Sequence, residues 1–239
     1  NTDQILIGKF LSSSSLGIYN IAFRIVMLPI QSITATILKV TFPVLSKVQN
    51  NKEKLKDIYL ITLLLVSIIV VPLSIGLSLL SNLFVELFLG ASWSEVAPLI
   101  SIMSISAMLK LILSTTGIIL LSRGLTSYIL KLTIFNISTL IIFIIIGLNY
   151  GLYGVAISYL CGILFLLVVN MYISWKAISL KITDGIKSIA FILINSLLMG
   201  LIIMLFEPIL LANIESKLIS FILLILIGIL SYLIGLKIK

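Results

Sequence analysis

The sequence predicts an all-α fold, a polytopic bundle of helices that crosses a membrane several times. Hydrophobic residues make up 61% of the 239 residues and charged residues 10%, and the mean hydropathy is +1.33. A soluble domain is about half apolar and about a quarter charged, so a soluble core of this size could not bury so many apolar side chains. Helices satisfy their own backbone hydrogen bonds within lipid, and we therefore expect the long apolar runs to be helical.

Seven apolar runs have the length of about 20 residues that a helix needs to cross the hydrocarbon. In chain order they are Ile18–Leu45, Ile58–Phe84, Ala97–Leu121, Tyr128–Leu148, Leu152–Trp175, Ile186–Phe206 and Leu218–Leu236. A shorter run, Asp3–Phe10, precedes them, and we expect it to be the outer end of a truncated N-terminal helix. We expect residues 1–239 to form a single transmembrane domain.

Basic residues fall in every second connection between these runs. The basic connections are Ser46–Asp57, Ser122–Ser127, Ser174–Lys187 and the tail after Leu236. The alternate connections, which are acidic or uncharged, are Glu86–Val96, Asn149–Gly151 and Glu207–Lys217. Lysine and arginine concentrate in the cytoplasmic connections of membrane proteins, so we expect the basic connections and the C-terminus to lie in the cytoplasm.

The composition argues against several classes of protein. The chain has no histidine and a single cysteine, Cys161, and it contains no paired-carboxylate motif, metal-ligand spacing or glycine-rich phosphate loop. We therefore expect neither an enzyme nor a cofactor or metal site. The net charge of +8 is explained by the lysines of the connections and by attraction to anionic membrane lipids, so nucleic acid is not an expected partner.

Lys110 is the charged residue that lies deepest in a predicted span. It is about thirteen residues from one end of Ala97–Leu121 and about eleven from the other, which places it near the middle of the bilayer. Ser106, Ser114 and Gly117 share its helical face. Two interpretations remain open. The lysine lines a water-filled cavity that binds substrate, or it bonds to a buried carbonyl or carboxylate of a neighbouring helix.

A second polar face combines Asn20, Arg24, Gln31 and Thr34 in the first span. Arg24 lies about six residues inside the outer end of this span, and Asp3 lies about eight residues below the same surface. Both side chains should therefore reach a depth of roughly 9–12 Å. We predict that Asp3 and Arg24 form an ion pair; the alternative is that each faces water separately.

Other polar residues in the spans suggest an anionic ligand and close helix packing. Arg24, Lys110 and Lys131 lie in the spans against one acid, Asp3, and a cavity lined in this way would attract phosphate or pyrophosphate on a lipid carrier. The amides expected to form hydrogen bonds between helices are Asn136, Asn170 and Asn195. The small residues expected to allow close helix packing are Gly154, Ser158 and Gly162.

Several motifs resemble a known family. They are DQILIGK (residues 3–9), LGIYN (16–20) followed by Ala22, Arg24 and Pro29, FPVLSKVQ (42–49), GASW (90–93), SRG (122–124) and GLYGVA (151–156). In these residues the chain resembles the second half of the Wzx-type polysaccharide flippases. These flippases form the polysaccharide-transporter branch of the superfamily that also contains the multidrug (MATE) exporters.

The resemblance implies a MATE-like transporter of fourteen helices in two lobes, of which this chain would be the C-terminal lobe. It implies that the transporter flips undecaprenyl-pyrophosphate-linked oligosaccharide across the bacterial cytoplasmic membrane for O-antigen, capsule or exopolysaccharide synthesis. The implied partners are the N-terminal lobe, membrane lipids and the polysaccharide polymerase machinery. In this interpretation Arg24, Lys110, Gln31 and Asn20 bind the substrate, and Asp3 either tunes Arg24 or carries a coupling ion.

Two other functions remain open. A MATE-type multidrug or cation antiporter would hold its cations with acids in the membrane, whereas the spans of this chain carry bases. A membrane glycan polymerase or ligase would present a large outer loop rich in arginine or histidine, whereas the outer connections of this chain are short. Both alternatives are therefore less favoured than the flippase.

Overall fold

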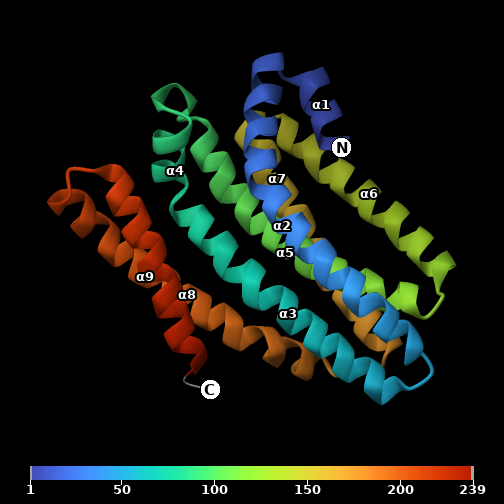
Figure 1. The fold of residues 1–239 in the computed structure, drawn as a ribbon. Helices are drawn as coiled ribbons and strands as arrows, with labels where there is room; N and C mark the ends of the chain where they lie inside the picture. Colours follow the sequence, from blue (N-terminus) through green and yellow to red (C-terminus); the bar gives the residue numbers. More distant parts are fainter. Residues whose placement is uncertain (1, 238–239) are drawn as a thin grey trace.

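The structure is a computed structural model that describes residues 2–237, and it consists of long helices that run back and forth between two ends (Figure 1). The helices are α1 (Thr2–Phe10), α2 (Ser13–Lys47), α3 (Lys52–Leu79), α4 (Ser81–Phe88), the short 3-10 helix η1 (Ala91–Trp93), α5 (Val96–Ser122), α6 (Thr126–Leu148), α7 (Gly151–Ala177), α8 (Ile182–Asn213) and α9 (Lys217–Lys237). Seven of them, α2, α3 and α5 to α9, are long and apolar enough to cross a membrane. The described residues contain no strand, and the prediction of a polytopic all-α bundle is confirmed.

Two of the predicted boundaries were wrong. The predicted span Ile58–Phe84 is broken at Leu80, and α4 and η1 occupy most of the predicted connection Glu86–Val96. Hydropathy could not separate α3 from α4, because α4 is itself apolar and buries Leu83 and Val85 against its neighbours. At the other site α8 continues through Pro208 to Asn213, well beyond the predicted end of its span.

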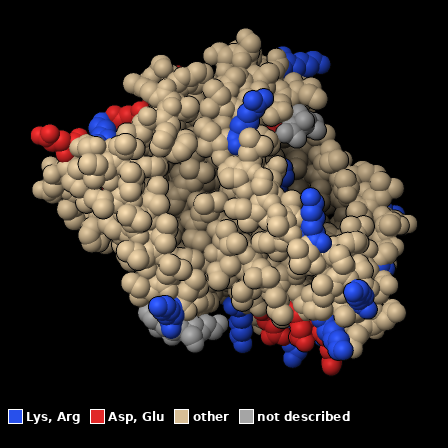
Figure 2. All heavy atoms as spheres, in the orientation of Figure 1, with Lys and Arg blue, Asp and Glu red and all other residues tan. Residues whose placement is uncertain are grey.

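The two ends of the bundle differ in charge as the sequence predicts. The turns at residues 48–51, 123–125 and 178–181 and the end of α9 lie at one end, which we call the lysine-rich end. Figure 2 shows most of the charged atoms near the edges of the visible face, with a broad uncharged surface between them. At the opposite end Lys217 of α9 and Glu86 of α4 form an ion pair at 2.5 Å, the only one between the residues that the structure describes.

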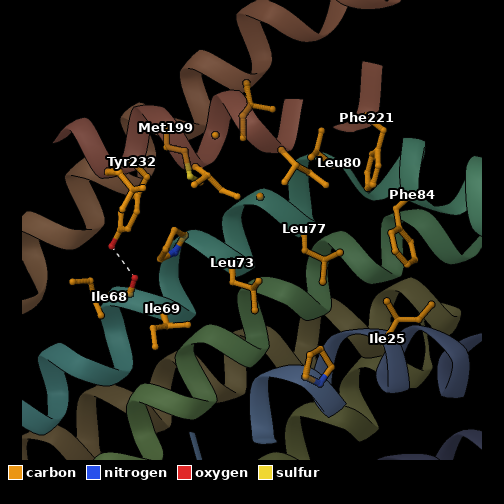
Figure 3. A pocket seen from close by; sticks show the side chains of 18 of the residues that line it. Ile25, Ile68, Ile69, Leu73, Leu77, Leu80, Phe84, Met199, Phe221 and Tyr232 are labelled. Atoms are coloured by element: carbon orange, nitrogen blue, oxygen red, sulfur yellow. Dashed lines mark hydrogen bonds between the residues drawn. The ribbon is translucent and has the colours of Figure 1, made fainter. Parts of the chain in front are cut away.

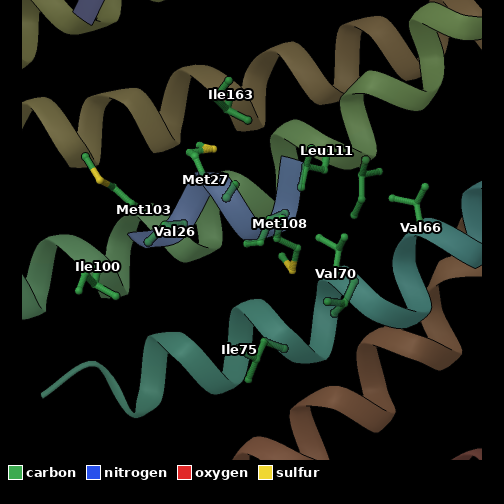
Figure 4. Packing of buried hydrophobic residues seen from close by; sticks show 14 of the residues in the cluster. Val26, Met27, Val66, Val70, Ile75, Ile100, Met103, Met108, Leu111 and Ile163 are labelled. Atoms are coloured by element: carbon green, nitrogen blue, oxygen red, sulfur yellow. The ribbon is translucent and has the colours of Figure 1, made fainter. Parts of the chain in front are cut away.

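Helix α5 forms the centre of the bundle. It is the most buried of the seven spans, and it packs against α2, α3 and α7. Figure 4 shows Val26 and Met27 of α2 and Val70 of α3 beside the α5 residues Met103 and Met108. Helices α8 and α9 pair with each other, and α8 joins this pair to the bundle through α3 (Figure 1).

Helices α6 and α7 approach each other closely through glycines. A Cβ atom added at Gly154 of α7 would lie 2.5 Å from the carbonyl oxygen of Gly147 in α6. A Cβ atom added at Gly162 would lie 3.2 Å from the side chains of Leu140 and Phe143. The predicted role of this stripe in close helix packing is therefore confirmed.

We expect the substitution Gly154→Ala to destabilise the protein by about 1–3 kcal/mol, because the added methyl group has no room against the α6 backbone. The matched control is Gly17→Ala in α2, where an added Cβ atom meets no atom within 4 Å. The control should be neutral or slightly stabilising, since alanine favours helix over glycine by about 1 kcal/mol. Thermal unfolding in detergent measures both variants, and equal stability would contradict the close contact.

Candidate functional site

Lys110 lies near the middle of α5, and its side chain is partly buried. The ammonium group donates a hydrogen bond of 3.1 Å to the hydroxyl of Tyr159 in α7. The same ammonium lies 5.8 Å from the centre of the Tyr159 ring, on the far side of the hydroxyl and close to the ring plane, so the contact is a hydrogen bond to the phenol oxygen. Lys110 therefore has a neutral phenol as its partner, not the carbonyl or carboxylate considered from the sequence.

Lys110 also lines a cavity of about 270 Å3 between α5, α6 and α7. The polar residues of the lining are Lys110, Ser114, Thr116, Thr133, Asn136 and Asn170. Gly117 of the predicted polar face lines it as well, whereas Ser106 is buried elsewhere and donates to the carbonyl of Ile102. Lys110 therefore borders a cavity and bonds to a phenol, and its role in substrate binding stays a prediction.

Asn136 of α6 and Asn170 of α7 bond to each other in the wall of this cavity. Asn170 donates to the side-chain oxygen of Asn136 at 3.0 Å, and Asn136 donates back at 3.4 Å. Asn195 of α8 donates to the carbonyl of Tyr232 in α9 at 2.9 Å. The predicted interhelical hydrogen bonds of these three amides are confirmed.

Asp3 is buried in α1, where it accepts a hydrogen bond of 2.8 Å from the hydroxyl of Tyr19. The predicted ion pair between Asp3 and Arg24 is absent, because the one ion pair between described residues joins Lys217 and Glu86. Tyr19 and Arg24 are five residues apart in α2, and at about 100° per residue their side chains leave the helix in widely different directions. Helix α1 packs on the side of Tyr19, so Arg24 cannot share it.

Arg24 and Gln31 are exposed, and Asn20 is partly buried on the same side of α2. The opposite side of α2 carries Val26 and Ile30, which are buried in the core. These three polar residues do not line the cavity at Lys110. The structure therefore does not bring the predicted substrate-binding residues into one cavity: Lys110 lies in one place and the α2 residues lie in another.

Tyr19 and Tyr159 are functional candidates that the sequence did not reveal. Tyr19 donates a hydrogen bond to Asp3, and Tyr159 accepts one from Lys110. The signal for Tyr159 was its position several residues inside the span Leu152–Trp175, because tyrosine usually lies at the ends of spans.

A second, apolar cavity opens on another side of the bundle. It has a volume of about 650 Å3, and it is formed by α3, α4, α8 and α9 with Ile25 and Pro29 of α2. Figure 3 shows Leu73 and Leu77 of α3, Met199 of α8 and Phe221 of α9 around it. The hydroxyl of Tyr232, the polar group of this lining, donates to the carbonyl of Ile68 at 2.9 Å. We call this cavity the apolar groove.

The described residues contain no cluster of three or more histidine, cysteine, aspartate or glutamate side chains that could hold a metal ion. The cavity at Lys110 offers a cation, hydroxyls and amides, and the apolar groove offers hydrocarbon contacts.

Comparison with known proteins identifies related chains. Residues 1–98 match the family described as polysaccharide biosynthesis protein. The chain is 31% identical over 124 residues to the teichuronic acid biosynthesis protein TuaB of Bacillus subtilis. The aligned residues are 52% of this chain and 26% of TuaB. It is 27% identical over 175 residues to the lipopolysaccharide biosynthesis protein WzxC of Escherichia coli. The aligned residues are 73% of this chain and 35% of WzxC.

A third relative is the succinoglycan biosynthesis transport protein ExoT of Rhizobium meliloti, 20% identical over 103 residues, which are 43% of this chain and 21% of that protein. In each of these matches the aligned segment is well under half of the relative's own length. The names of the three relatives refer to the biosynthesis of teichuronic acid, lipopolysaccharide and succinoglycan. The motifs at residues 3–49 lie inside the matched family region. Over these segments the chain is therefore similar to proteins of bacterial polysaccharide biosynthesis, in agreement with the resemblance of its motifs.

Proposed function

We propose that this chain is the C-terminal lobe of a flippase that moves undecaprenyl-pyrophosphate-linked oligosaccharide across the bacterial cytoplasmic membrane. The observation that carries the proposal is the presence, in one bundle, of a cationic polar cavity at mid-span and a separate apolar groove. A lipid-linked oligosaccharide needs both surfaces, because its sugars and phosphates must leave water while its isoprenoid chain stays in hydrocarbon. The names of the related proteins support polysaccharide biosynthesis as the setting.

In this proposal each cavity holds one part of the substrate. Lys110 attracts the anionic head group, and desolvation of that group costs less beside a fixed cation than in hydrocarbon. The apolar groove holds part of the isoprenoid chain, because its lining leaves no polar group without a partner. Figure 2 shows an uncharged surface in the region of α8 and α9, between the two ends of the bundle. No covalent step is required, and none is proposed.

The exposed polar side of α2 has a different role in the proposal. Asn20, Arg24 and Gln31 face away from the core of this lobe, so they are free to line a cavity shared with an N-terminal lobe. Rocking of the two lobes would expose that cavity to each side of the membrane in turn. Membrane lipids and the polysaccharide polymerase machinery are the other proposed partners.

Asp3 is the proposed site of ion coupling, because it is a buried acid whose hydrogen-bond partner among the described residues is the neutral hydroxyl of Tyr19. We expect Asp3→Asn in the full-length protein to make transport independent of an imposed proton or sodium gradient. The control is Asp57→Asn, which removes an exposed acid at the lysine-rich end and should leave gradient dependence unchanged. Retained gradient dependence in Asp3→Asn vesicles would contradict the assignment.

The proposed orientation places the lysine-rich end in the cytoplasm. In a Cys161→Ser background, we expect Ser92→Cys to react with a membrane-impermeant maleimide from outside right-side-out vesicles. Asn50→Cys should react only after permeabilisation, although both side chains are exposed in the structure. The reverse pattern of labelling would invert the topology.

A reconstitution experiment tests the proposed function. The full-length protein is placed in vesicles that carry a fluorescent lipid-linked oligosaccharide, and a glycan-cleaving enzyme added outside reports which leaflet holds the sugar. Protein-dependent exposure of the inner-leaflet pool is the expected result. Efflux of organic cations without glycan movement would favour a multidrug antiporter, and lengthened or transferred glycan would favour a polymerase or ligase.

A further inference from the structure

The cavity between α5, α6 and α7 has features that the proposed function does not use. We propose that it is a subsite for one pyranose ring bearing an oxyanion, in which Lys110 binds the oxyanion and Thr133 with the Asn136–Asn170 pair binds ring hydroxyls. The inference rests on the proposed function for the class of substrate, and it assigns new residues within that site. The oxyanion is the carboxylate of an acidic sugar or the phosphate that links the first sugar to its carrier.

The volume of the cavity fits one sugar. Pockets for small molecules generally have about 300–1,000 Å3, and this cavity, at about 270 Å3, lies just below that range. A whole oligosaccharide would not enter it, whereas a single ring with one charged substituent is of suitable size. The remainder of the glycan would extend outside the lobe, toward the exposed polar side of α2 or toward water.

The charge of the cavity favours an anion. Lys110 is the one charged residue in the lining, and among the described residues its hydrogen-bond partner is the neutral Tyr159. An ammonium group has three N–H donors, so two remain for a ligand. Tyr159 fixes the position of the ammonium group through its hydroxyl but supplies no negative charge. An ionised group held in a membrane without a counter-charge is costly, and an oxyanion from the ligand would supply the missing charge.

The amide pair provides donors and acceptors for hydroxyl groups. Asn170 uses both N–H groups, one toward Asn136 and one toward the carbonyl of Leu166 at 2.8 Å. Asn136 uses one N–H toward Asn170, so its second N–H remains available, and each amide oxygen keeps one lone pair. A sugar hydroxyl both donates and accepts, and this combination of free groups suits it. The pair also holds both amides in fixed orientations before any ligand binds.

Three hydroxyl residues, Ser114, Thr116 and Thr133, complete the polar wall. Ser114 donates to the carbonyl of Leu111 at 2.6 Å, which leaves its oxygen able to accept. Thr133 lies in the lining and is exposed, and no hydrogen bond of its hydroxyl is recorded within the described chain. Thr133 therefore offers a test position, because valine matches its shape and removes only the hydroxyl group.

Ligand binding to the purified full-length protein in detergent tests the subsite. Isothermal titration with glucose 1-phosphate, glucuronate, glucose and inorganic phosphate provides the four arms. We expect one or both of the two charged sugars to bind more tightly than glucose or phosphate alone. Tighter binding of glucose 1-phosphate would identify the carrier phosphate as the natural oxyanion, and tighter binding of glucuronate would identify an acidic sugar.

Variants separate the two halves of the subsite. Lys110→Met should weaken the binding of the charged sugars by about tenfold or more. Lys131→Met, at an exposed lysine outside the cavity, should leave their binding unchanged. Thr133→Val and Asn136→Leu should weaken the binding of the charged sugars several-fold and leave the binding of inorganic phosphate unchanged. Thr133→Val keeps the test valid if Asn136→Leu fails to fold, because no recorded contact of the protein depends on that hydroxyl.

The results distinguish this inference from the proposed function. A protein that flips lipid-linked oligosaccharide while Lys110→Met and Thr133→Val bind all four ligands like the wild type would overturn the subsite and leave the flippase intact. A protein with the expected binding pattern but no flipping activity would support the subsite and overturn the flippase. Equal binding of phosphate and the charged sugars would also overturn the subsite, because the ring would then contribute nothing.

Discussion

Replacing Lys110 by methionine in the full-length protein should reduce flipping of lipid-linked oligosaccharide by about 10- to 100-fold. A hydrogen bond to a charged group contributes about 1.5–3 kcal/mol, and about 1.4 kcal/mol corresponds to a factor of ten. Methionine keeps much of the length of the lysine side chain, so the change removes the charge and its donors with little change in packing. The loss appears as a lower rate in the vesicle assay at equal protein content.

The matched control is Lys131→Met. Lys131 also lies in a predicted span, but it is exposed on α6 and lines neither cavity. We expect this variant to retain a rate within about twofold of the wild type, and Lys110→Arg to recover part of the activity because the positive charge returns. Similar rates for Lys110→Met and Lys131→Met would mean that Lys110 has no special role in transport.

The sequence was sufficient for the membrane class and for the number of spans, because hydropathy summed over about 20 residues is a strong signal in lipid. It failed where two helices follow each other without a polar break. Helix α3 ends at Leu79 and α4 begins at Ser81, and both are apolar. Their separation depends on packing of α4 against α5 and α9, which both come later in the chain.

The candidate site shows the same limit in its residues. Lys110 could be predicted because a charge at mid-span is costly and therefore conspicuous. Its partner Tyr159 could not, since nothing in the sequence specifies that α5 and α7 are neighbours. The ion pair of Asp3 with Arg24 was predicted from depth alone. Depth was insufficient, because the direction of a side chain around its helix decides which neighbour it meets, and α1 meets Tyr19.

The cavity at Lys110 depends on the position of α7, which carries Tyr159 and Asn170. Trp175 helps to hold α7 in place at the lysine-rich end. Its side chain is 3% exposed, and its indole N–H donates to the hydroxyl of Tyr59 in α3 at 3.0 Å. On another side a Cβ atom added at Gly185 of α8 would lie 2.5 Å from the indole ring. One side chain of α7 therefore contacts both α3 and α8.

We expect Trp175→Ala to destabilise the protein by about 3–5 kcal/mol, because it leaves a large cavity and removes the donor to a buried phenol. Trp175→Phe should cost less, since it keeps an aromatic ring between α3 and α8 and removes the N–H. Thermal unfolding of the purified protein in detergent measures each change.

The chain has two tryptophans, and the second provides the control. Trp93 lies in η1 and is 37% exposed. Its replacement by alanine should cost about 0.5 kcal/mol or less, as expected of a surface substitution. A large loss for Trp175→Ala with a small loss for Trp93→Ala would locate the stabilising contact between α3, α7 and α8. A loss for Trp175→Ala as small as that expected for Trp93→Ala would mean that the lysine-rich end does not depend on this ring, and that α7 is held in place by its contacts with α5 and α6.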